Sequence, residues 1–230
     1  PTLLAGHSLG EYTALVVAEV LSFSEALALV RLRAQAMQDA VPEGIGGMAA
    51  ILGLDEQTIQ SICDEITSLG NGDLLEPANF NSPGQVVIAG HKNAILRGIE
   101  LAKSKGAKRA IMLPMSIPSH CSLMQPAAET MQRQLAHLTL QAPTIRILHN
   151  DNVKTHSDAA SIKQILIQQL ISAVRRVDTI QAFSVAGVTN IVECGPGKVL
   201  AGLNKRINSN LQQLPLADSE AIRQAVNSLS

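Results

Sequence analysis

Ser8 is the residue whose surroundings most favour a chemical role. It lies in the motif Gly6-His7-Ser8-Leu9-Gly10, after the apolar run 3–5 and before the segment 11–17. The apolar run predicts the end of a buried strand, and the segment that follows predicts a helix. A Gly-x-Ser-x-Gly turn between a strand and a helix is typical of a nucleophile elbow, in which residues without a Cβ allow a tight turn that lifts the serine hydroxyl clear of the sheet. The motif therefore predicts nucleophilic chemistry at Ser8.

A serine hydroxyl is a poor nucleophile until a base takes its proton, so we expect a histidine partner. His120 is the strongest candidate, because it lies in a loop that follows the inserted unit described below, and catalytic groups favour loops on rigid scaffolds. A hydrogen-bonded loop histidine is the alternative. Cys121 is a poor nucleophile for His120, because neighbouring side chains of an extended loop diverge. The other histidines have simpler structural interpretations, in the turn, at helix ends or around a strand end: His7, His91, His137, His149 and His156.

Arg33 is a candidate for binding an anion. Its neighbours at three and four residues along a predicted helix are all apolar, whereas Arg31 shares a more polar face with Gln35. A guanidinium on an apolar face is costly unless an anion pairs with it. That anion is either a carboxylate of the protein, in a structural ion pair, or an anionic substrate held in bidentate fashion. The helical pattern alone leaves both interpretations open.

The elements that must position these residues predict an α/β fold with two domains. After the helix at 11–17, a second helix is expected to begin with Ser24 as its N-cap and to run to about Ala40. Residues 45–114 then follow the order βαββαβ, a complete ferredoxin-like unit, and predict an inserted small domain. Its strands are expected at 48–52, 74–80, 85–89 and 107–113, and its helices at 55–68 and 93–105.

Residues 1–44 and 115–230 would form a discontinuous large domain with a parallel sheet, because α/β alternation returns after the inserted unit. The segment Gly195-Pro196-Gly197 predicts a tight strand-to-helix turn rather than a phosphate loop, since no Gly-x-Gly-x-x-Gly or Walker pattern follows it. Helices are expected at 123–137, 158–172 and 177–186 and from residue 198, and strands at 144–149 and 189–193.

Composition narrows the classes of function. The net charge is −1, tryptophan is absent and aromatic residues make up 2% of the chain, which argues against nucleic acid and a membrane surface as partners. No apolar run has the length of a membrane span, and we expect neither a membrane span nor a signal peptide. Cys63, Cys121 and Cys194 lack metal-ligand spacing and fit reduced thiols, so we expect no metal and a cytoplasmic location.

Five motifs occur along the chain in the order Gly6-His7-Ser8-Leu9-Gly10-Glu11-Tyr12, Val41-Pro42-Glu43-Gly44, Asn79-Phe80-Asn81-Ser82-Pro83-Gly84-Gln85, Pro118-Ser119-His120-Cys121 and Glu193-Cys194-Gly195-Pro196-Gly197-Lys198-Val199-Leu200. Together they closely resemble those of the malonyl-CoA:acyl carrier protein transacylases, which load malonyl units for type II fatty-acid synthesis. The resemblance covers essentially the whole chain. It implies an α/β-hydrolase-like large domain that carries a ferredoxin-like small domain.

The resemblance implies a role for each candidate. Ser8 would attack the malonyl thioester and carry the malonyl group as an ester. His120 would act as the general base and then as the acid toward the leaving thiol. Arg33 would hold the free carboxylate of malonate.

Further residues enter only through the resemblance. The backbone carbonyl of Gln169, rather than an acidic residue, would orient His120. The backbone N–H of Leu9 would supply one oxyanion donor. Asn81 and Gln85 would lie near the mouth of the pocket.

The implied substrate is malonyl-CoA, and the implied partner is acyl carrier protein, which contributes its phosphopantetheine thiol. No bound cofactor is expected, and a monomer is the simplest expectation. Because the carrier is acidic, basic side chains are candidates for contacting it: Lys103, Lys105, Lys108, Arg109, Arg175, Arg176, Lys205 and Arg206. A solvated basic surface is the alternative for each of them.

The family also has a segment before the elbow strand, with a second oxyanion donor, so we expect this chain to be N-terminally truncated. Two other functions therefore stay open: a non-catalytic piece that binds the carrier, and a serine hydrolase such as a thioesterase. A hydrolase would need a triad acid between nucleophile and base, and Asp55, Asp64 and Asp73 all fall in the inserted unit, a poor place for one. Glu19, where the family usually has glycine, is expected to be a milder surface change.

Overall fold

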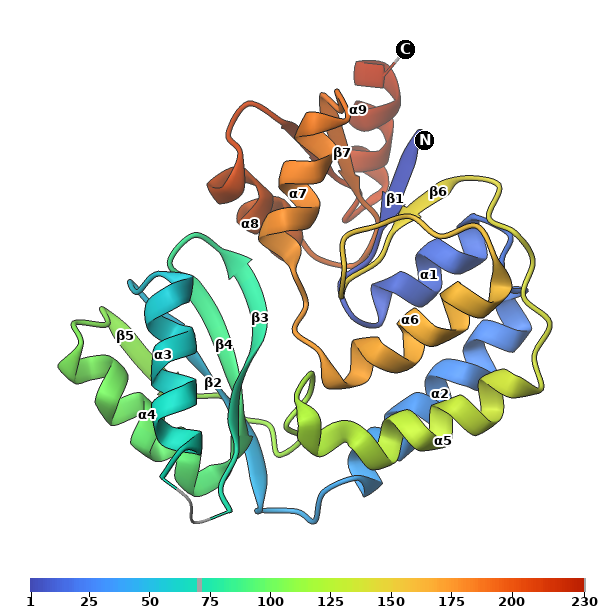
Figure 1. The fold of residues 1–230 in the computed structure, drawn as a ribbon. Helices are drawn as coiled ribbons and strands as arrows, with labels where there is room; N and C mark the ends of the chain where they lie inside the picture. The colour runs from blue at the N-terminus through green and yellow to red at the C-terminus, as the bar shows by residue number, and fades with distance from the viewer. Residues whose placement is uncertain (70–71, 230) are drawn as a thin grey trace.

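The elbow strand pairs with a strand from much later in the sequence. In a computed structural model that describes residues 1–69 and 72–229, β1 (Leu3–Ala5) lies parallel to β6 (Arg146–Leu148), with Ala5 opposite Leu148. Figure 1 shows the two strands side by side above α1 (Gly10–Val17). Because parallel strands end at the same edge of a sheet, the turn after β1 and the loop after β6 meet there.

Four helices pack on this pair and bury the main apolar core. They are α1, α2 (Phe23–Asp39), α5 (Gln125–Ala136) and α6 (Ala159–Ile171), and their apolar faces meet around Leu15, Leu29, Met131 and Leu166. The N-cap predicted for α2 is wrong. Ser22, not Ser24, caps the helix, because the Ser22 side chain accepts from the N–H of Glu25 while the Glu25 side chain accepts from the N–H of Ser22.

Between α2 and α5 in the sequence, the chain forms an antiparallel sheet with two helices, in the order βαββαβ that the sequence predicts. The spatial order of the strands is β3-β4-β2-β5, and Figure 1 shows α3 and α4 together on one face. One face of the sheet packs on these helices through Ile51, Ile88 and Ile95, and the other packs toward Cys121 and Leu123. The elements are β2 (Gly46–Leu52), α3 (Glu56–Thr67), β3 (Leu75–Ser82), β4 (Gln85–His91), α4 (Lys92–Ser104) and β5 (Arg109–Met112).

The last part of the chain adds a second parallel pair, β7 (Asn190–Glu193) with β8 (Gln212–Pro215). The helices around it are α7 (Arg176–Val185), α8 (Val199–Ile207) and α9 (Ser219–Leu229). β8 and α9 are not among the elements predicted from the sequence. Most of the other predicted elements are confirmed to within a few residues, although the segment expected to open α5 begins as a 3₁₀ turn, η1 (Ser122–Met124).

The antiparallel sheet is joined to the rest through β3. The N–H of Val174 donates to the carbonyl of Ala78 at 2.9 Å, and the N–H of Phe80 donates to the carbonyl of Val174 at 3.0 Å. Val174 lies between α6 and α7, so β3 is tied to the chain just after the C-terminal end of α6. Of the helices in 1–69 and 72–229, none is long and apolar enough to cross a membrane.

Candidate active site

Ser8 lies at the sharp turn between β1 and α1, in a left-handed backbone conformation with φ 52°. Asn150, in the loop after β6, holds this turn from the side. Its Oδ1 accepts from the Ser8 N–H at 2.7 Å, and its Nδ2 donates to the Gly6 carbonyl at 2.7 Å. A non-glycine residue in this conformation persists where its surroundings fix it. Here Asn150 supplies part of that constraint.

The two glycines of the motif have different roles. A Cβ on Gly6 would lie 1.9 Å from the carbonyl carbon of Gly10 and 2.0 Å from the nitrogen of Glu11, whereas a Cβ on Gly10 would meet nothing within 4 Å. The elbow therefore requires glycine at position 6 because the start of α1 passes directly over it. The expectation that the tight turn needs a residue without a Cβ on either side of Ser8 is therefore wrong for Gly10.

His120 faces the serine hydroxyl. Its Nε2 lies 2.8 Å from Ser8 Oγ, and its Nδ1 lies 2.8 Å from the backbone carbonyl of Gln169. A carbonyl can only accept, so the ring carries its proton on Nδ1 and presents the Nε2 lone pair to Ser8. Burial, together with the nearby charge of Arg33, lowers the pKa of His120 to about 4. At neutral pH the ring is uncharged and can accept the serine proton.

Arg33 points its guanidinium at the same hydroxyl. Nη2 donates to Ser8 Oγ at 2.8 Å and to Gln169 Oε1 at 3.0 Å, and the guanidinium carbon lies 5.6 Å from the centre of the Tyr12 ring. The side chain is buried, whereas Arg31 is exposed, as the helical pattern predicts. Burial lowers the pKa of Arg33. Within the described part of the chain, none of the ion pairs includes Arg33.

The N–H of Leu9 lies at the N-terminal end of α1, where backbone donors have no partner within the helix. It makes no hydrogen bond to any of the residues 1–69 and 72–229, whereas the N–H of Gly10 already donates to the carbonyl of His7 at 3.1 Å. The dipole of α1 adds partial positive charge at this end. A negative oxygen beside Ser8 would therefore meet an available donor.

Glu11 and His149 form a buried pair close to Ser8 that the sequence does not predict. Glu11 Oε1 lies 2.6 Å from His149 Nδ1, and both side chains are fully buried. His149 is a structural residue at the end of a strand, as the sequence predicts, but its contact with Glu11 beside Ser8 is not among the predictions. A signal was present, because His149 and Asn150 follow a strand predicted to run parallel to the elbow strand, and polar groups at the carboxyl ends of such strands often form sites.

The comparisons with known proteins match this geometry to a family. Residues 1–217 match the family model described as an acyl transferase domain. The chain is 48% identical over 226 residues to the malonyl CoA-acyl carrier protein transacylase of Salmonella typhimurium, covering 98% of this chain and 72% of the relative. The chain belongs to the malonyl-CoA–acyl carrier protein transacylases. The corresponding protein of Bacillus subtilis is 44% identical over 229 residues, again with 72% of its length covered.

Solved structures of transacylases have the same fold. The acyl-carrier-protein S-malonyltransferase of Burkholderia pseudomallei superposes with a TM-score of 0.96 at 50% identity, covering 99% of this chain and 73% of that one. A malonyl-transacylase in complex with a type II PKS acyl-carrier protein gives a TM-score of 0.96 at 44% identity, with 99% and 73% covered. An α/β fold follows for this chain.

Asn81 and Gln85, the two residues that the resemblance places near the pocket mouth, make no hydrogen bond to Ser8, His120 or Arg33 in the described structure. Gln85 Oε1 accepts instead from Arg206 Nη1 at 2.9 Å, and Asn81 Oδ1 is buried without a partner in the described structure. Asn81 lies near the end of β3 and Gln85 begins β4, on either side of the turn that joins the two strands. Their place near a pocket mouth stays a prediction. Arg176 was expected on the surface, as a candidate contact for the carrier. This expectation is wrong, because Arg176 is buried and donates to Asn204.

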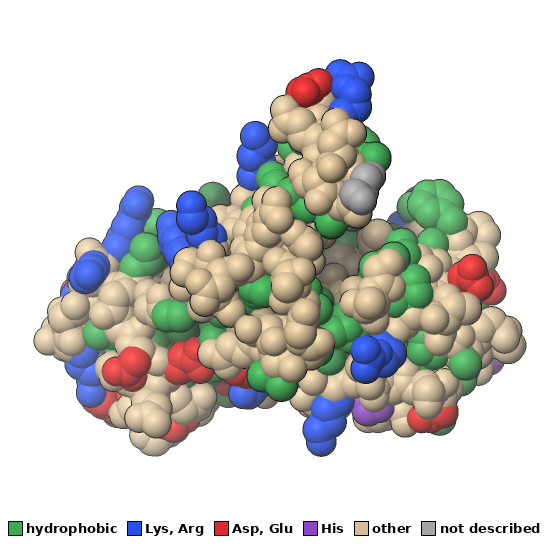
Figure 2. All heavy atoms as spheres, turned by 90° about the horizontal axis from the view of Figure 1, so that it is seen from above, with side chains coloured by type: hydrophobic (Ala, Val, Ile, Leu, Met, Phe, Trp, Pro, Cys, Tyr) green, Lys and Arg blue, Asp and Glu red, His purple; other side chains and the backbone are tan. Residues whose placement is uncertain are grey.

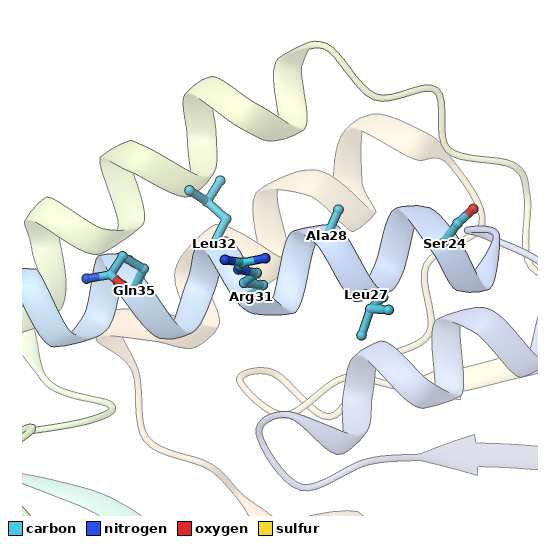
Figure 3. Close-up of a pocket in the computed structure, with 6 residues that line it drawn as sticks. All are labelled: Ser24, Leu27, Ala28, Arg31, Leu32 and Gln35. Carbon is cyan, nitrogen blue, oxygen red and sulfur yellow. The ribbon is translucent and has the colours of Figure 1, made fainter.

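A hollow of about 620 Å³ lies along the outer face of α2, away from the residues around Ser8. Figure 3 shows that all of its labelled residues come from this one helix: Ser24, Leu27, Ala28, Arg31, Leu32 and Gln35. Neither Ser8 nor His120 lines it. Across residues 1–69 and 72–229, no cluster of three or more histidine, cysteine or acidic side chains could hold a metal ion.

Proposed function

We propose that the chain transfers a malonyl group from malonyl-CoA to the phosphopantetheine thiol of acyl carrier protein, through a malonyl ester on Ser8. The observation that carries the proposal is the position of Arg33. Its Nη2 lies 2.8 Å from Ser8 Oγ, and no carboxylate of the described chain forms an ion pair with it. A buried cation beside a nucleophile favours an acyl group that carries its own carboxylate.

In the first half of the reaction, Ser8 Oγ attacks the thioester carbonyl of malonyl-CoA as His120 Nε2 takes the hydroxyl proton. The C–O bond forms, and the negative carbonyl oxygen is held by the N–H of Leu9. When the C–S bond breaks, His120 returns the proton to the leaving CoA sulfur. The Gln169 carbonyl, 2.8 Å from Nδ1, holds the ring in place throughout.

The second half reverses these steps with a different thiol. His120 takes the proton of the phosphopantetheine thiol, the sulfur attacks the ester carbonyl, and Ser8 leaves with the proton that His120 returns. The group that orients His120 is the backbone carbonyl of Gln169. A serine hydrolase would use an acidic side chain in this place, as the third member of a triad. Asp55 caps α3, Asp64 accepts from Gln60, and Asp73 pairs with Arg97.

The surroundings of the site complete the proposal. Residues 45–114 would act as a ferredoxin-like small domain on an α/β-hydrolase-like large domain formed by 1–44 and 115–230, with Asn81 and Gln85 near the pocket mouth. We propose a cytoplasmic monomer without a bound cofactor or metal. Figure 2 shows Lys and Arg side chains at several separate places on one face of the molecule, with Asp and Glu side chains among them. Several candidate carrier contacts already have acidic neighbours, such as Lys103 with Glu100 and Lys105 with Glu65.

Intact-mass measurement tests the acyl-enzyme directly. Incubation with malonyl-CoA is expected to add one malonyl group to the chain, and Ser8→Ala is expected to abolish the addition. The ester should then pass to phosphopantetheinylated acyl carrier protein faster than it decays to free malonate. Faster decay to malonate would favour a hydrolase, and no gain in mass would leave a carrier-binding piece at most.

Acyl selectivity tests Arg33. Arg33→Ala is expected to lower the rate of malonyl transfer to Ser8 by about tenfold to a hundredfold, because a charge-assisted hydrogen bond to a carboxylate is worth about 1.5–3 kcal/mol. Acetyl-CoA has no second carboxylate and should be affected less. Arg31→Ala, on the exposed face of the same helix, is the matched control. Equal losses for malonyl and acetyl groups would contradict the role of Arg33.

A further inference from the structure

Glu11 and His149 form a fully buried pair that the proposed reaction does not use. Both side chains are 0% exposed, and Glu11 Oε1 lies 2.6 Å from His149 Nδ1. Glu11 is on the first turn of α1, close to Ser8, and His149 follows β6. A buried carboxylate is costly unless its oxygens are hydrogen-bonded. What the rest of the carboxylate contacts therefore indicates what the pair does.

The second oxygen of Glu11 faces the catalytic residues. Oε2 accepts from Gln169 Nε2 at 2.8 Å and from the N–H of Asn150 at 3.1 Å. Gln169 Nε2 also donates to the Ser8 carbonyl at 3.2 Å. At its other end, Gln169 Oε1 accepts from Arg33 Nη2 at 3.0 Å. The Gln169 side chain thus links Glu11 to Arg33, while its backbone carbonyl contacts His120.

We propose that Glu11 is a positioning residue that fixes the orientation of the Gln169 side-chain amide, and through it the guanidinium of Arg33. A carboxylate can only accept, so the NH₂ end of the amide must face Glu11 and the carbonyl end must face Arg33. In the opposite orientation, the NH₂ group would face the N–H donors of Arg33 and the contact would be lost. The proposal rests on the proposed function, in which Arg33 selects the malonyl group.

Gln169 also keeps two buried opposite charges apart. If Glu11 reached Arg33 directly, the carboxylate would occupy the donors that are needed for the carboxylate of malonate. With the neutral amide between them, Glu11 stabilises the guanidinium from a distance, and Nη2 remains beside Ser8 Oγ. The arrangement supports a buried cation without filling its binding direction.

His149 holds Glu11 from the far side. His149 Nε2 is buried and has no partner in the described structure, whereas Nδ1 contacts Glu11. The neutral ring with its proton on Nδ1 fits these surroundings, because a second N–H on Nε2 would be buried without an acceptor. Glu11 is thereby fixed between His149 on one oxygen and the donors of Asn150 and Gln169 on the other.

Three substitutions at Glu11 separate orientation from charge. In Glu11→Gln, the new carbonyl can accept from Asn150 and Gln169 while the new NH₂ donates to His149 in its other tautomer. That tautomer places an N–H on Nε2 without an acceptor, which lowers stability, but the charge is lost and the orientation of Gln169 is kept. Glu11→Asp keeps the charge but draws the acceptor away from Gln169. Glu11→Ala removes both.

The measurement is the ratio of the rates at which malonyl-CoA and acetyl-CoA acylate Ser8, followed by intact mass. We expect the ratio to stay within about threefold of wild type in Glu11→Gln, to fall about tenfold in Glu11→Ala, and to lie between these in Glu11→Asp. General damage to the fold would lower both rates together and leave the ratio unchanged.

An unchanged ratio in Glu11→Ala would overturn the proposal, and Glu11→Asp decides the question if the alanine variant does not fold. A ratio that falls as far in Glu11→Gln as in Glu11→Ala would also overturn it, because charge rather than orientation would then be responsible. Wild-type chain that takes up neither acyl group would instead contradict the proposed function, so the two failures are distinguishable.

Discussion

The two ends of α1 both turn through a residue with a left-handed backbone, but they are held in different ways. Ser8, before the helix, has φ 52°, and Glu19, after it, has φ 62°. At Ser8 the contacts come from distant parts of the chain, including Asn150 and His120. At Glu19 they are local: the N–H of Glu19 donates to Val16 and that of Val20 to Leu15. The second pattern is a Schellman motif, which usually has glycine at this position.

The left-handed backbone has a chemical role at Ser8 but none at Glu19. Ser8 Oγ contacts both His120 Nε2 and Arg33 Nη2, so its conformation aims a reactive atom. Glu19 is exposed and makes no ion pair among the described residues. Changes at the Ser8 end should therefore cost folding and acylation together, whereas changes at the Glu19 end should affect stability alone.

The largest effect is expected at Gly6. Gly6→Ala places a Cβ within about 2 Å of backbone atoms of α1, which cannot move aside as a flexible side chain could. We expect a loss of about 4 kcal/mol or more in the free energy of unfolding, measured by denaturant titration, together with loss of Ser8 acylation. Gly10→Ala is the matched control and should change stability by less than about 1 kcal/mol. Equal costs at the two positions would contradict the packing argument.

Acidification is expected to have the second largest effect, by lowering the free energy of unfolding through two histidines near Ser8. Burial lowers the pKa of His120 to about 4 and that of the adjacent His7 to about 3, both below the ordinary value of 6.5. The unfolded chain then binds more protons than the folded chain between pH 6.5 and 4, so stability falls as the pH falls through this range. Each histidine contributes up to about 1.4 kcal/mol per pH unit.

Denaturant titrations between pH 7 and 5 measure this slope. His7→Asn should reduce it, whereas substitution of the exposed His137 should leave it as in wild type. A His7→Asn variant with an unchanged slope would remove His7 from the explanation.

Asn150 should have a smaller but still substantial effect. Asn150→Ala leaves the Ser8 N–H and the Gly6 carbonyl without the partners that lie at 2.7 Å. Two unsatisfied, partly buried backbone groups are expected to cost about 2–3 kcal/mol, and the acylation rate should fall because the elbow is no longer fixed. Stability and intact-mass measurements check both parts. A stable variant with wild-type acylation would show that α1 alone holds the turn.

The sequence predicts most elements of this fold because their apolar residues are periodic, as in α3 and β4. It fails where the pattern is weak or the decisive partner is distant. β8 is half polar, and its pairing with β7 is not visible in its own residues. The Ser22 cap could have been found, because Ser22 and Glu25 have the spacing of a capping box.

The candidate site divides in the same way. The motif around Ser8 and the apolar neighbours of Arg33 mark those residues locally. His149 is marked only by its place at the end of a strand, and its neighbours do not identify its partner Glu11, which is 138 residues away in the sequence. Arg176 was expected on the surface because of its charge, but Asn204 of α8 provides it with a buried acceptor.

The smallest expected effect lies at the far end of α1 and completes the comparison. Glu19 has the C′ position of the Schellman motif, where a Cβ costs about 1–2 kcal/mol in the left-handed conformation and glycine avoids that cost. The greater entropy of glycine in the unfolded chain offsets part of the gain. Glu19→Gly should therefore raise the free energy of unfolding by about 0.5–1 kcal/mol without changing Ser8 acylation. Glu19→Ala keeps the Cβ and should leave the free energy of unfolding nearly unchanged. If Glu19→Ala stabilised the protein as much as Glu19→Gly, the cost would lie in the Glu19 side chain and not in its backbone conformation.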